Sequence, residues 1–306
     1  MISFTSRRRI RHGLALGATA TITALVLTGC GEEGGGDNGG DGDVTTITVG
    51  ANPVPHARIL EYVDENLAED AGIDLEINEY DDYQTPNRVL DEGGDDANYY
   101  QHLPFLEQQE EDLGYDFDHG DPIHLEPYAG FSEKHDSIDD LPDGATIGIT
   151  NDPANQPRAL QLLEAEGLLE DIGDDDGALD LTDEQNPKGL EFEESQPEFL
   201  AQVVDDDSID LAIINGNYFL EAGLSVDDAL VVESAEDSPW GNMLVWRAGD
   251  DNDAIATLEE LLHSQEVADF ITEEWPNGEI IPAEGDSSES SEDASDEENA
   301  EEEDAE

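Results

Sequence analysis

The alternation of apolar and polar positions predicts a series of strands and helices between residues 44 and 283. Short β-branched and apolar runs, such as 45–50 and 145–150, are typical of buried strands. Longer runs with apolar residues three and four positions apart, such as 57–69, are typical of amphipathic helices. By the same criteria, strands are predicted at 75–77, 97–100, 190–193, 209–214, 229–233 and 243–246, and helices at 86–90, 158–169, 197–204 and 253–275.

The order of these elements predicts an α/β protein with two lobes. Strands and helices alternate twice along the chain, which implies parallel sheets with ligand-binding loops at the carboxyl ends of the strands. We expect one lobe to comprise residues 44–127 and 240–283 and the other to comprise 128–239, with crossovers near 125–132 and 233–246. The cleft between two such lobes is a common place for a small-ligand site.

The stretch 145–169 predicts an anion receptor. Its strand is followed by turn-forming residues, and Pro157 suits the first turn of a helix. Arg158 then places a guanidinium beside the free N–H groups and the positive dipole end of that helix, which suits a carboxylate or a phosphate. The alternative is an ordinary helix start with a solvated arginine. The scarcity of arginine in this chain favours the receptor.

The composition is extremely acidic and excludes several partners. The 306 residues include 80 acidic and 10 basic ones, for a formal net charge of −70. Such a surface repels nucleic acid and anionic lipid headgroups. Its self-repulsion is relieved when salt shortens the Debye length to about 3 Å near 1 M. We therefore expect a halophilic protein, since 37% hydrophobic residues and clear periodicity argue against disorder in the centre of the chain.

Both ends of the chain differ in character from the centre. Basic residues precede an apolar run at 14–27, which predicts a signal peptide over 1–29, exported by either the general or the twin-arginine route. The run ends in Leu-Thr-Gly-Cys, which resembles a lipobox. Cys30 is the single cysteine of the chain, and we expect it to be lipidated rather than to be an incidental thiol. Residues 30–43 predict a flexible tether, and 284–306 a disordered acidic tail.

A colinear set of motifs spans nearly the whole centre of the chain. The motifs are GANPVPHA (50–57), NYYQHLPFL (98–106), HLEP (124–127), LPDGA (141–145), NDPAN (151–155), IN (214–215), EAGL (221–224) and DSPWGN (237–242). In these motifs the chain resembles the NlpA-type methionine-binding lipoprotein family. The resemblance implies a type II periplasmic-binding-protein-like fold and an extracytoplasmic lipoprotein. It also implies that the chain captures methionine, or a close relative, for the permease subunits of an ABC importer, without a cofactor.

The resemblance also implies which residues hold the ligand. Arg158 matches the arginine that binds the ligand carboxylate, and Asn215 and Asn242 match the asparagines that hold the amino acid's backbone groups. The positions that line the side-chain pocket are Tyr83, Tyr100, His102 and Phe105. The chain departs from the family pattern in having Pro157 for Gly, Tyr99-Tyr100 for Phe-Phe, Phe105 for Tyr, and the sequence Asn-Gly-Asn after the strand at 209–214.

Two other functions fit the sequence less well than ligand capture. A metal-binding surface lipoprotein is the main alternative, but the histidines show neither HxH nor HExxH spacing: His56, His102, His119, His124, His135 and His263. Catalysis is not expected, because the sequence has no GxSxG motif, no candidate nucleophilic cysteine and no phosphate-binding loop.

Overall fold

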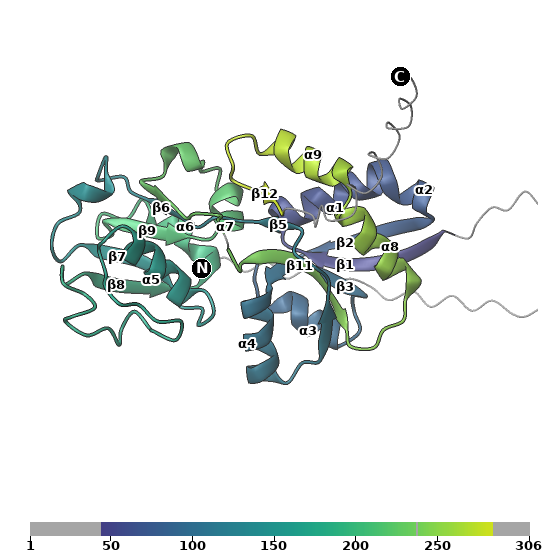
Figure 1. Ribbon diagram of the computed structural model, residues 1–306, viewed down its shortest axis with the longest axis horizontal. Helices are drawn as coiled ribbons and strands as arrows, with labels where there is room; N and C mark the ends of the chain where they lie inside the picture. The colour runs from purple at the N-terminus through teal and green to yellow at the C-terminus, as the bar shows by residue number, and fades with distance from the viewer. Residues whose placement is uncertain (1–43, 237, 284–306) are drawn as a thin grey trace, which may run out of the picture. The chain divides into compact units, whose positions relative to one another are not determined.

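A computed structural model describes residues 44–236 and 238–283, which form two β-sheets with their own helices (Figure 1). The predicted signal peptide, Cys30, the tether and the acidic tail lie outside these residues. Within the described part of the chain, no helix is both long and apolar enough to cross a membrane.

The first sheet has seven strands and combines the N-terminal and C-terminal parts of the described chain. Its order is β12-β5-β11-β3-β1-β2, with β4 paired to β11. Strand β1 is parallel to β2 and β3, as predicted, whereas β11 is antiparallel to β3. The strands are β1 (Thr45–Ala51), β2 (Ile73–Glu79), β3 (Ala97–His102), β4 (Phe117–His119), β5 (His124–Leu125), β11 (Gly241–Arg247) and β12 (Ile281–Pro282).

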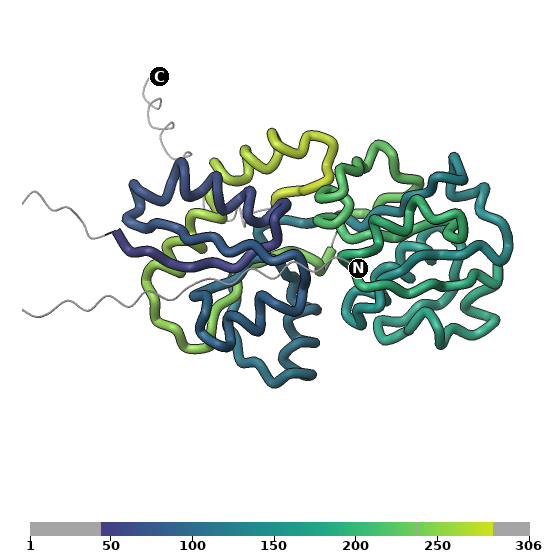
Figure 2. The backbone as a smooth tube through the Cα atoms, turned by 180° about the vertical axis from the view of Figure 1, so that it is seen from behind, coloured from purple at the N-terminus to yellow at the C-terminus, as the bar shows by residue number. Residues whose placement is uncertain are grey.

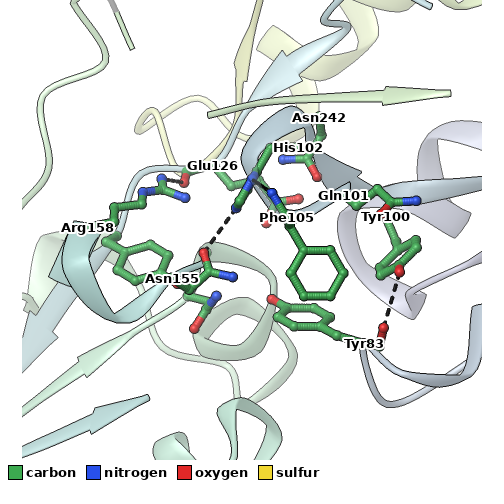
Figure 3. A pocket seen from close by; sticks show the side chains of 12 residues that line it. Tyr83, Tyr100, Gln101, His102, Phe105, Glu126, Asn155, Arg158 and Asn242 are labelled. Atoms are coloured by element: carbon green, nitrogen blue, oxygen red, sulfur yellow. Dashed lines mark hydrogen bonds between the residues drawn. The ribbon is translucent and has the colours of Figure 1, made fainter. Parts of the chain in front are cut away.

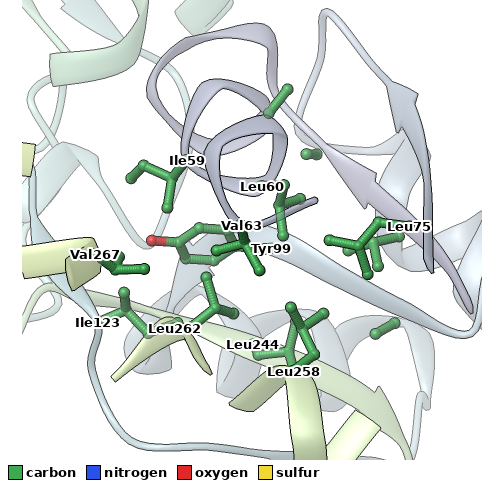
Figure 4. Packing of buried hydrophobic residues seen from close by; sticks show 14 of the residues in the cluster. Ile59, Leu60, Val63, Leu75, Tyr99, Ile123, Leu244, Leu258, Leu262 and Val267 are labelled. Atoms are coloured by element: carbon green, nitrogen blue, oxygen red, sulfur yellow. The ribbon is translucent and has the colours of Figure 1, made fainter. Parts of the chain in front are cut away.

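Helices pack apolar faces against this sheet and form its core. Leu60 and Val63 of α1 lie in the same buried cluster as Tyr99 of β3 and Leu258 of α8 (Figure 4). This burial removes apolar surface from water and holds the sheet in place. The helices are α1 (Arg58–Val63), which continues through Asp64–Ala68 into α2 (Glu69–Ala71), α3 (Thr85–Asp91), α4 (Leu103–Leu113), α8 (Asp253–Leu262) and α9 (Gln265–Glu274).

The prediction of one helix over 253–275 was wrong. The chain forms α8 and α9 instead, and the break falls at His263 and Ser264. Ser264 has extended backbone angles, and its hydroxyl accepts a hydrogen bond from the N–H of Val267, so it caps the start of α9. The cap turns the second helix while both keep their apolar faces on the core.

The second sheet has the order β10-β6-β9-β7-β8. Strand β7 is parallel to β8 and β9, and β6 is antiparallel to β9 and β10. Ile147 and Ile149 of β7 are completely buried, which confirms the predicted strand. The elements are β6 (Ala129–Phe131), β7 (Thr146–Thr150), α5 (Gln156–Ala165), β8 (Glu191–Ser195), α6 (Leu200–Val203), β9 (Leu211–Ile214), α7 (Gly216–Glu221) and β10 (Val231–Val232), with single turns at Ile138–Asp140, Pro197–Phe199 and Val226–Asp228.

Helix α5 begins two residues before the predicted helix at 158–169 and ends four residues before it. It ends at Ala165, and Gly167 adopts a left-handed φ of 70°. The N–H of Leu168 then bonds back to the carbonyl of Leu163 at 2.9 Å, which closes the helix end. Leu168 and Leu169 are still buried, so their apolar character reflects packing beyond the helix rather than helix continuation.

The chain passes between the two sheets twice. It leaves the first sheet after β5 and enters the second at β6, and it returns between β10 and β11. Figure 2 shows the yellow C-terminal segment back beside the purple and blue N-terminal segments, while teal and green segments form the second sheet. Residues at or just after the ends of β3, β7 and β9 form part of the candidate site: His102, Asn155, Arg158 and Asn215.

Candidate functional site

All seven residues that the resemblance assigns to the ligand line one cavity (Figure 3). The space between these residues measures about 320 Å³, including the part that is open to solvent. Its wall comes from both lobes. The lining residues are Tyr83, Tyr100, Gln101, His102, Phe105, Glu126, Tyr128, Asn155, Arg158, Asn215, Gly216 and Asn242.

Strand ends bring these residues together. His102 is the last residue of β3, Asn215 directly follows β9, and Arg158 lies in the first turn of α5 after β7. Asn242 in β11 is the register partner of His102. The polar side chains therefore gather where strands end, as expected for open α/β sheets.

Arg158 is buried and already holds a carboxylate of the protein. Its Nε donates to Glu233 Oε1 at 2.8 Å, and its Nη2 donates to Glu233 Oε2 at 2.5 Å and to the backbone oxygen of Glu126 at 2.7 Å. Only 4% of the residue is exposed, so the alternative of a solvated arginine was wrong. Burial alone would lower the pKa of the guanidinium, but Glu233 raises it above its ordinary value.

Three of the five guanidinium N–H groups are used by these bonds, which leaves the two on Nη1. No bond from Nη1 is formed with any residue that the structure describes. The guanidinium also makes cation–π contacts with two aromatic rings. The Cζ atom of Arg158 lies 4.1 Å from the ring centroid of Tyr128 and 5.1 Å from the ring centroid of Trp240. Arg158 is thus fixed in place with one nitrogen free to donate.

His102 is a neutral hydrogen-bonding group that connects the two lobes. Its Nδ1 accepts from the N–H of Phe105 at 3.2 Å, and its Nε2 lies 3.0 Å from Asn155 Oδ1. The proton must therefore be on Nε2, which donates to Asn155. Burial, followed by the charge of Arg158, lowers the pKa of His102 to about 3.

Glu126 lies at the centre of a buried cluster. Its Oε1 is 2.9 Å from His124 Nε2 and 3.0 Å from His56 Nε2, and its Oε2 accepts from the N–H of Asn217 at 3.1 Å. Tyr99 donates its hydroxyl to Nδ1 of His124. Burial raises the pKa of the Glu126 carboxyl, but the two histidines outweigh it and hold the pKa below its ordinary value.

The polar groups nearest the cavity are not all paired. Asn215 Oδ1 and the Tyr128 hydroxyl are buried and have no hydrogen-bond partner among the described residues. Burying a polar atom without a hydrogen-bond partner costs free energy, so a ligand that supplies the partner is favoured. Asn242 is partly used, since its Oδ1 lies 3.2 Å from His56 Nε2. The cavity therefore offers an open acceptor on Asn215 and open donors on Arg158 Nη1.

The other end of the cavity is aromatic. The ring centroids of Tyr83, Tyr100 and Phe105 lie between 5.8 and 6.1 Å apart. Both tyrosine hydroxyls have partners: Tyr83 donates to Asn217 Oδ1 at 2.6 Å, and Tyr100 donates to the backbone oxygen of Tyr83 at 3.1 Å. Because these hydroxyls are already paired, the three rings offer the cavity mainly apolar surface.

A family model for the NlpA lipoproteins matches residues 47–284 of the chain. The chain belongs to the NlpA lipoprotein family. It is similar to the methionine-binding lipoprotein MetQ of Bacillus subtilis, with 37% identity over 274 residues, which cover 88% of this chain and 98% of the relative.

Solved structures of similar proteins agree with this family assignment. They support the two-lobed type II periplasmic-binding fold for this NlpA lipoprotein. One is a putative lipoprotein from Actinomyces odontolyticus, 50% identical, with a TM-score of 0.74 over 79% of this chain and 100% of that one. Another is a nutrient binding protein from Burkholderia cenocepacia bound to methionine. It is 33% identical, with a TM-score of 0.72 over 78% of this chain and 99% of that one.

Several residues that shape the cavity of this NlpA lipoprotein were not predicted from the sequence to have a role there. Glu126 stood within the family motif at 124–127, and Asn155 within that at 151–155, so the motifs carried a signal that the assigned roles did not use. Glu233 lies outside every motif, and its contact with Arg158 joins positions 75 residues apart. Local pattern contains no signal for such a pair.

Histidine spacing argued against the metal alternative, but spacing along the sequence does not reveal a cluster that forms only in the fold. Candidate ligand atoms of His56, His124 and Glu126 lie within 4.8 Å of one another. Hydrogen bonds nevertheless pair most of its polar atoms without an ion, because each histidine can donate its Nε2–H to Glu126 and Tyr99 can donate to His124; His56 Nδ1 has no partner among the described residues. These hydrogen bonds explain the burial of the three groups.

Proposed function

We propose that this NlpA lipoprotein is an extracytoplasmic binding protein that captures methionine, or a close relative, and delivers it to an ABC importer. The observation that carries the proposal is the division of one small cavity into a polar end and an aromatic end. An amino acid with a long apolar side chain has the same division.

The polar end suits the backbone groups of an amino acid. Nη1 of Arg158 can donate to a carboxylate oxygen, while Asn215 Oδ1 can accept from an ammonium group. Asn242 and Glu126 flank the same space. A free amino acid would supply partners for groups that are unpaired in the ligand-free protein, which gives binding a favourable term.

The aromatic end suits a thioether. Tyr83, Tyr100 and Phe105 surround the space with rings whose hydroxyls, where present, are paired within the protein. Contacts between sulfur and aromatic rings contribute about 0.3–1.5 kcal/mol each. The name of the Bacillus relative and the methionine in the Burkholderia structure support this choice over other apolar amino acids.

We infer that the chain binds and releases its ligand without converting it. His102 and Asn155 bond across the two lobes, as do Tyr83 and Asn217, so the lobes enclose the cavity together. Opening and closing of two lobes around a ligand is the motion of periplasmic binding proteins. The closed form would be the one that the permease subunits recognise.

The proposed location follows from the N-terminal sequence. A lipid on Cys30 and the tether at 30–43 would hold the folded part at the extracytoplasmic face of the cell membrane. From there the protein can collect ligand and present it to permease subunits in the same membrane.

A thermal-shift panel of all amino acids and common divalent metals, in molar salt, tests the proposal. At a fixed concentration, a ligand that binds only the folded state raises the melting temperature more when it binds more tightly. We expect methionine to give the largest shift among the amino acids. A shift with zinc and none with any amino acid would contradict the proposal and support the metal-binding alternative.

A further inference from the structure

Trp240 contacts one cavity residue from each lobe, although it is not itself one of the residues that line the cavity. Its ring centroid lies 5.0 Å from that of His102, and the two rings meet edge to face at 75°. Its ring centroid also lies 5.1 Å from the Cζ atom of Arg158. Because His102 ends β3 in the first lobe and Arg158 lies in α5 of the second, one indole bridges both lobes.

Trp240 also lines an open groove on the surface. The groove lies between α4 and the start of α5, and its space measures about 1090 Å³, including the part that is open to solvent. Neighbouring residues divide between the two spaces: Pro104 lines the groove and Phe105 the cavity. Ala154 and Asn155 divide in the same way. These segments therefore separate the groove from the cavity, and Trp240 lies beside them.

Packing in a hydrophobic core does not explain Trp240. The other two tryptophans belong to the core of the first lobe, where Trp275 is buried and Trp246 packs against the buried residues. Trp240 is half-buried and belongs to no hydrophobic cluster among the residues that the structure describes. Its contacts with His102 and Arg158 are therefore the main interactions that its ring makes.

The backbone attaches Trp240 to the first lobe. The next residue, Gly241, begins β11 and pairs with β5 in the first sheet. A Cβ on Gly241 would lie 2.5 Å from the Cβ of Pro122, which is too close for two carbon atoms, so glycine lets the backbone approach this segment. Strand β11 also pairs with β3, which ends at His102. The first sheet therefore holds both Trp240 and His102.

The contact between Trp240 and Arg158 is consequently one that opening of the lobes would break. Separation of the lobes moves α5 away from the first sheet, while the indole stays beside His102. In the closed form the indole covers Arg158 on the side of the groove, and only 4% of Arg158 is exposed. Exclusion of water from a charged group strengthens its attraction to a bound anion.

We propose that Trp240 is a positioning residue that retains the ligand: its indole covers Arg158 in the closed form, and release of methionine along the groove requires this contact to break. This inference rests on the proposed function, in which Arg158 binds the ligand carboxylate. The indole acts through Arg158 rather than on the ligand. It therefore affects mainly the rate of release, since changes at a binding site usually alter dissociation more than association.

The rate of methionine release, measured in molar salt, tests this role. Bound radiolabelled methionine is chased with an excess of unlabelled methionine. Trp240→Ala should release it about 10-fold faster than the wild-type chain. Trp240→Phe keeps an aromatic ring over the guanidinium and should be closer to wild type. Phe199→Ala removes an exposed aromatic ring that lines neither the groove nor the cavity, and it should leave the rate unchanged.

Tryptophan fluorescence gives a readout that a purely structural role would not change. Methionine should alter the emission of the wild-type chain, because closure brings the guanidinium of Arg158 against the indole of Trp240. Trp240→Phe retains Trp246 and Trp275, neither of which lines the cavity, and its emission should not respond to methionine.

The results separate failure of this inference from failure of the proposed function. If the wild-type chain binds methionine, an unchanged release rate in Trp240→Ala, or an equal emission response in wild type and Trp240→Phe, would overturn the inference alone. Absence of methionine binding by the wild-type chain would remove the proposed function and this inference with it. If Trp240→Ala did not melt cooperatively, the emission comparison with Trp240→Phe would decide the matter.

Discussion

His102 donates its Nε2–H to Asn155 Oδ1 at 3.0 Å, and this bond joins the end of β3 in one lobe to the start of α5 in the other. The bond requires a neutral ring, since Nδ1 accepts from the N–H of Phe105. The groups that face the ring are Asn155, Arg158 and Glu126, and Arg158 disfavours a second proton. A contact between the lobes therefore depends on the protonation state of one histidine.

We predict that this histidine makes the protein lose stability in mild acid. The pKa of His102 is about 3 in the folded protein against an ordinary value of 6.5, so the unfolded chain binds a proton that the folded chain cannot. The free energy of unfolding should fall by up to about 1.4 kcal/mol per pH unit below about pH 6.5 through this residue. His124, whose pKa burial also lowers, acts in the same direction.

Denaturation curves in molar salt from about pH 7 to about pH 5 measure this slope. The many surface carboxylates also titrate, so the comparison is between the wild-type chain and His102→Gln, in which they are unchanged. The variant should show the shallower dependence on pH. Equal slopes for the two chains would mean that His102 is not held neutral.

Asn215 is predicted to stabilise the complex at the expense of the free protein. Its buried Oδ1 has no partner among the described residues, and an unsatisfied acceptor of this kind costs about 1–3 kcal/mol. Asn215→Leu should therefore leave the stability of the ligand-free chain unchanged or raise it, while methionine affinity falls about tenfold or more.

Asn98 provides the matched control for that experiment. It is fully buried, donates to Asn87 Oδ1 at 2.9 Å and accepts from Gln101 Nε2 at 2.8 Å. Asn98→Leu should lower the melting temperature because it breaks a satisfied network. If both variants lost the same stability, Asn215 would be a structural residue rather than one that waits for a ligand.

The acidic composition predicts a strong dependence on salt. With 80 acidic and 10 basic residues, repulsion between like charges opposes the compact state, and molar salt screens that repulsion. The free energy of unfolding and methionine affinity should both rise from dilute buffer to about 1 M salt. Equal stability under the two conditions would refute the halophilic interpretation.

Deleting the C-terminal residues 284–306 tests whether the negative charge of this segment affects solubility or ligand binding. This segment carries 13 acidic residues and lies outside the family match except for its first position. Its deletion should lower solubility and leave methionine affinity in molar salt unchanged. A loss of binding on deletion would show that the segment does more than solvate the protein.

Cys30 is predicted to be the site of membrane attachment. Labelling with a radioactive fatty acid should mark the wild-type chain and not Cys30→Ser, and the variant should be released from the membrane. One acyl chain binds membranes only marginally, so we expect more than one on the mature cysteine. Equal labelling of both chains would exclude this residue as the anchor.

The sequence predicted the strands and the fold class because buried strands leave a local signal. The β-branched run that forms β7 is one example, and its following turn and helix were also located. Helices that begin at a local side-chain cap, which the apolar pattern does not mark, were missed or merged. Helix α4 begins at the His102 cap and α9 at the Ser264 cap, and neither begins where its apolar pattern does.

The pattern of apolar and polar residues along the sequence predicts less about the cavity than about the fold. The resemblance named seven residues that do line it, including Arg158 and Asn215. It could not indicate that Glu233 pairs with Arg158, or that His56 contacts Glu126, because these contacts join residues far apart in the sequence. The balance of charge in the cavity is therefore a property of the fold alone.

The most direct test of the account is a calorimetric titration of methionine into the wild-type chain and Arg158→Ala, in molar salt. We predict one saturable site in the wild-type chain. The variant should bind more weakly by roughly 2–5 kcal/mol, because both Glu233 and the ligand carboxylate lose their partner. Absence of saturable binding in the wild-type chain, or equal affinity in the two chains, would contradict the account.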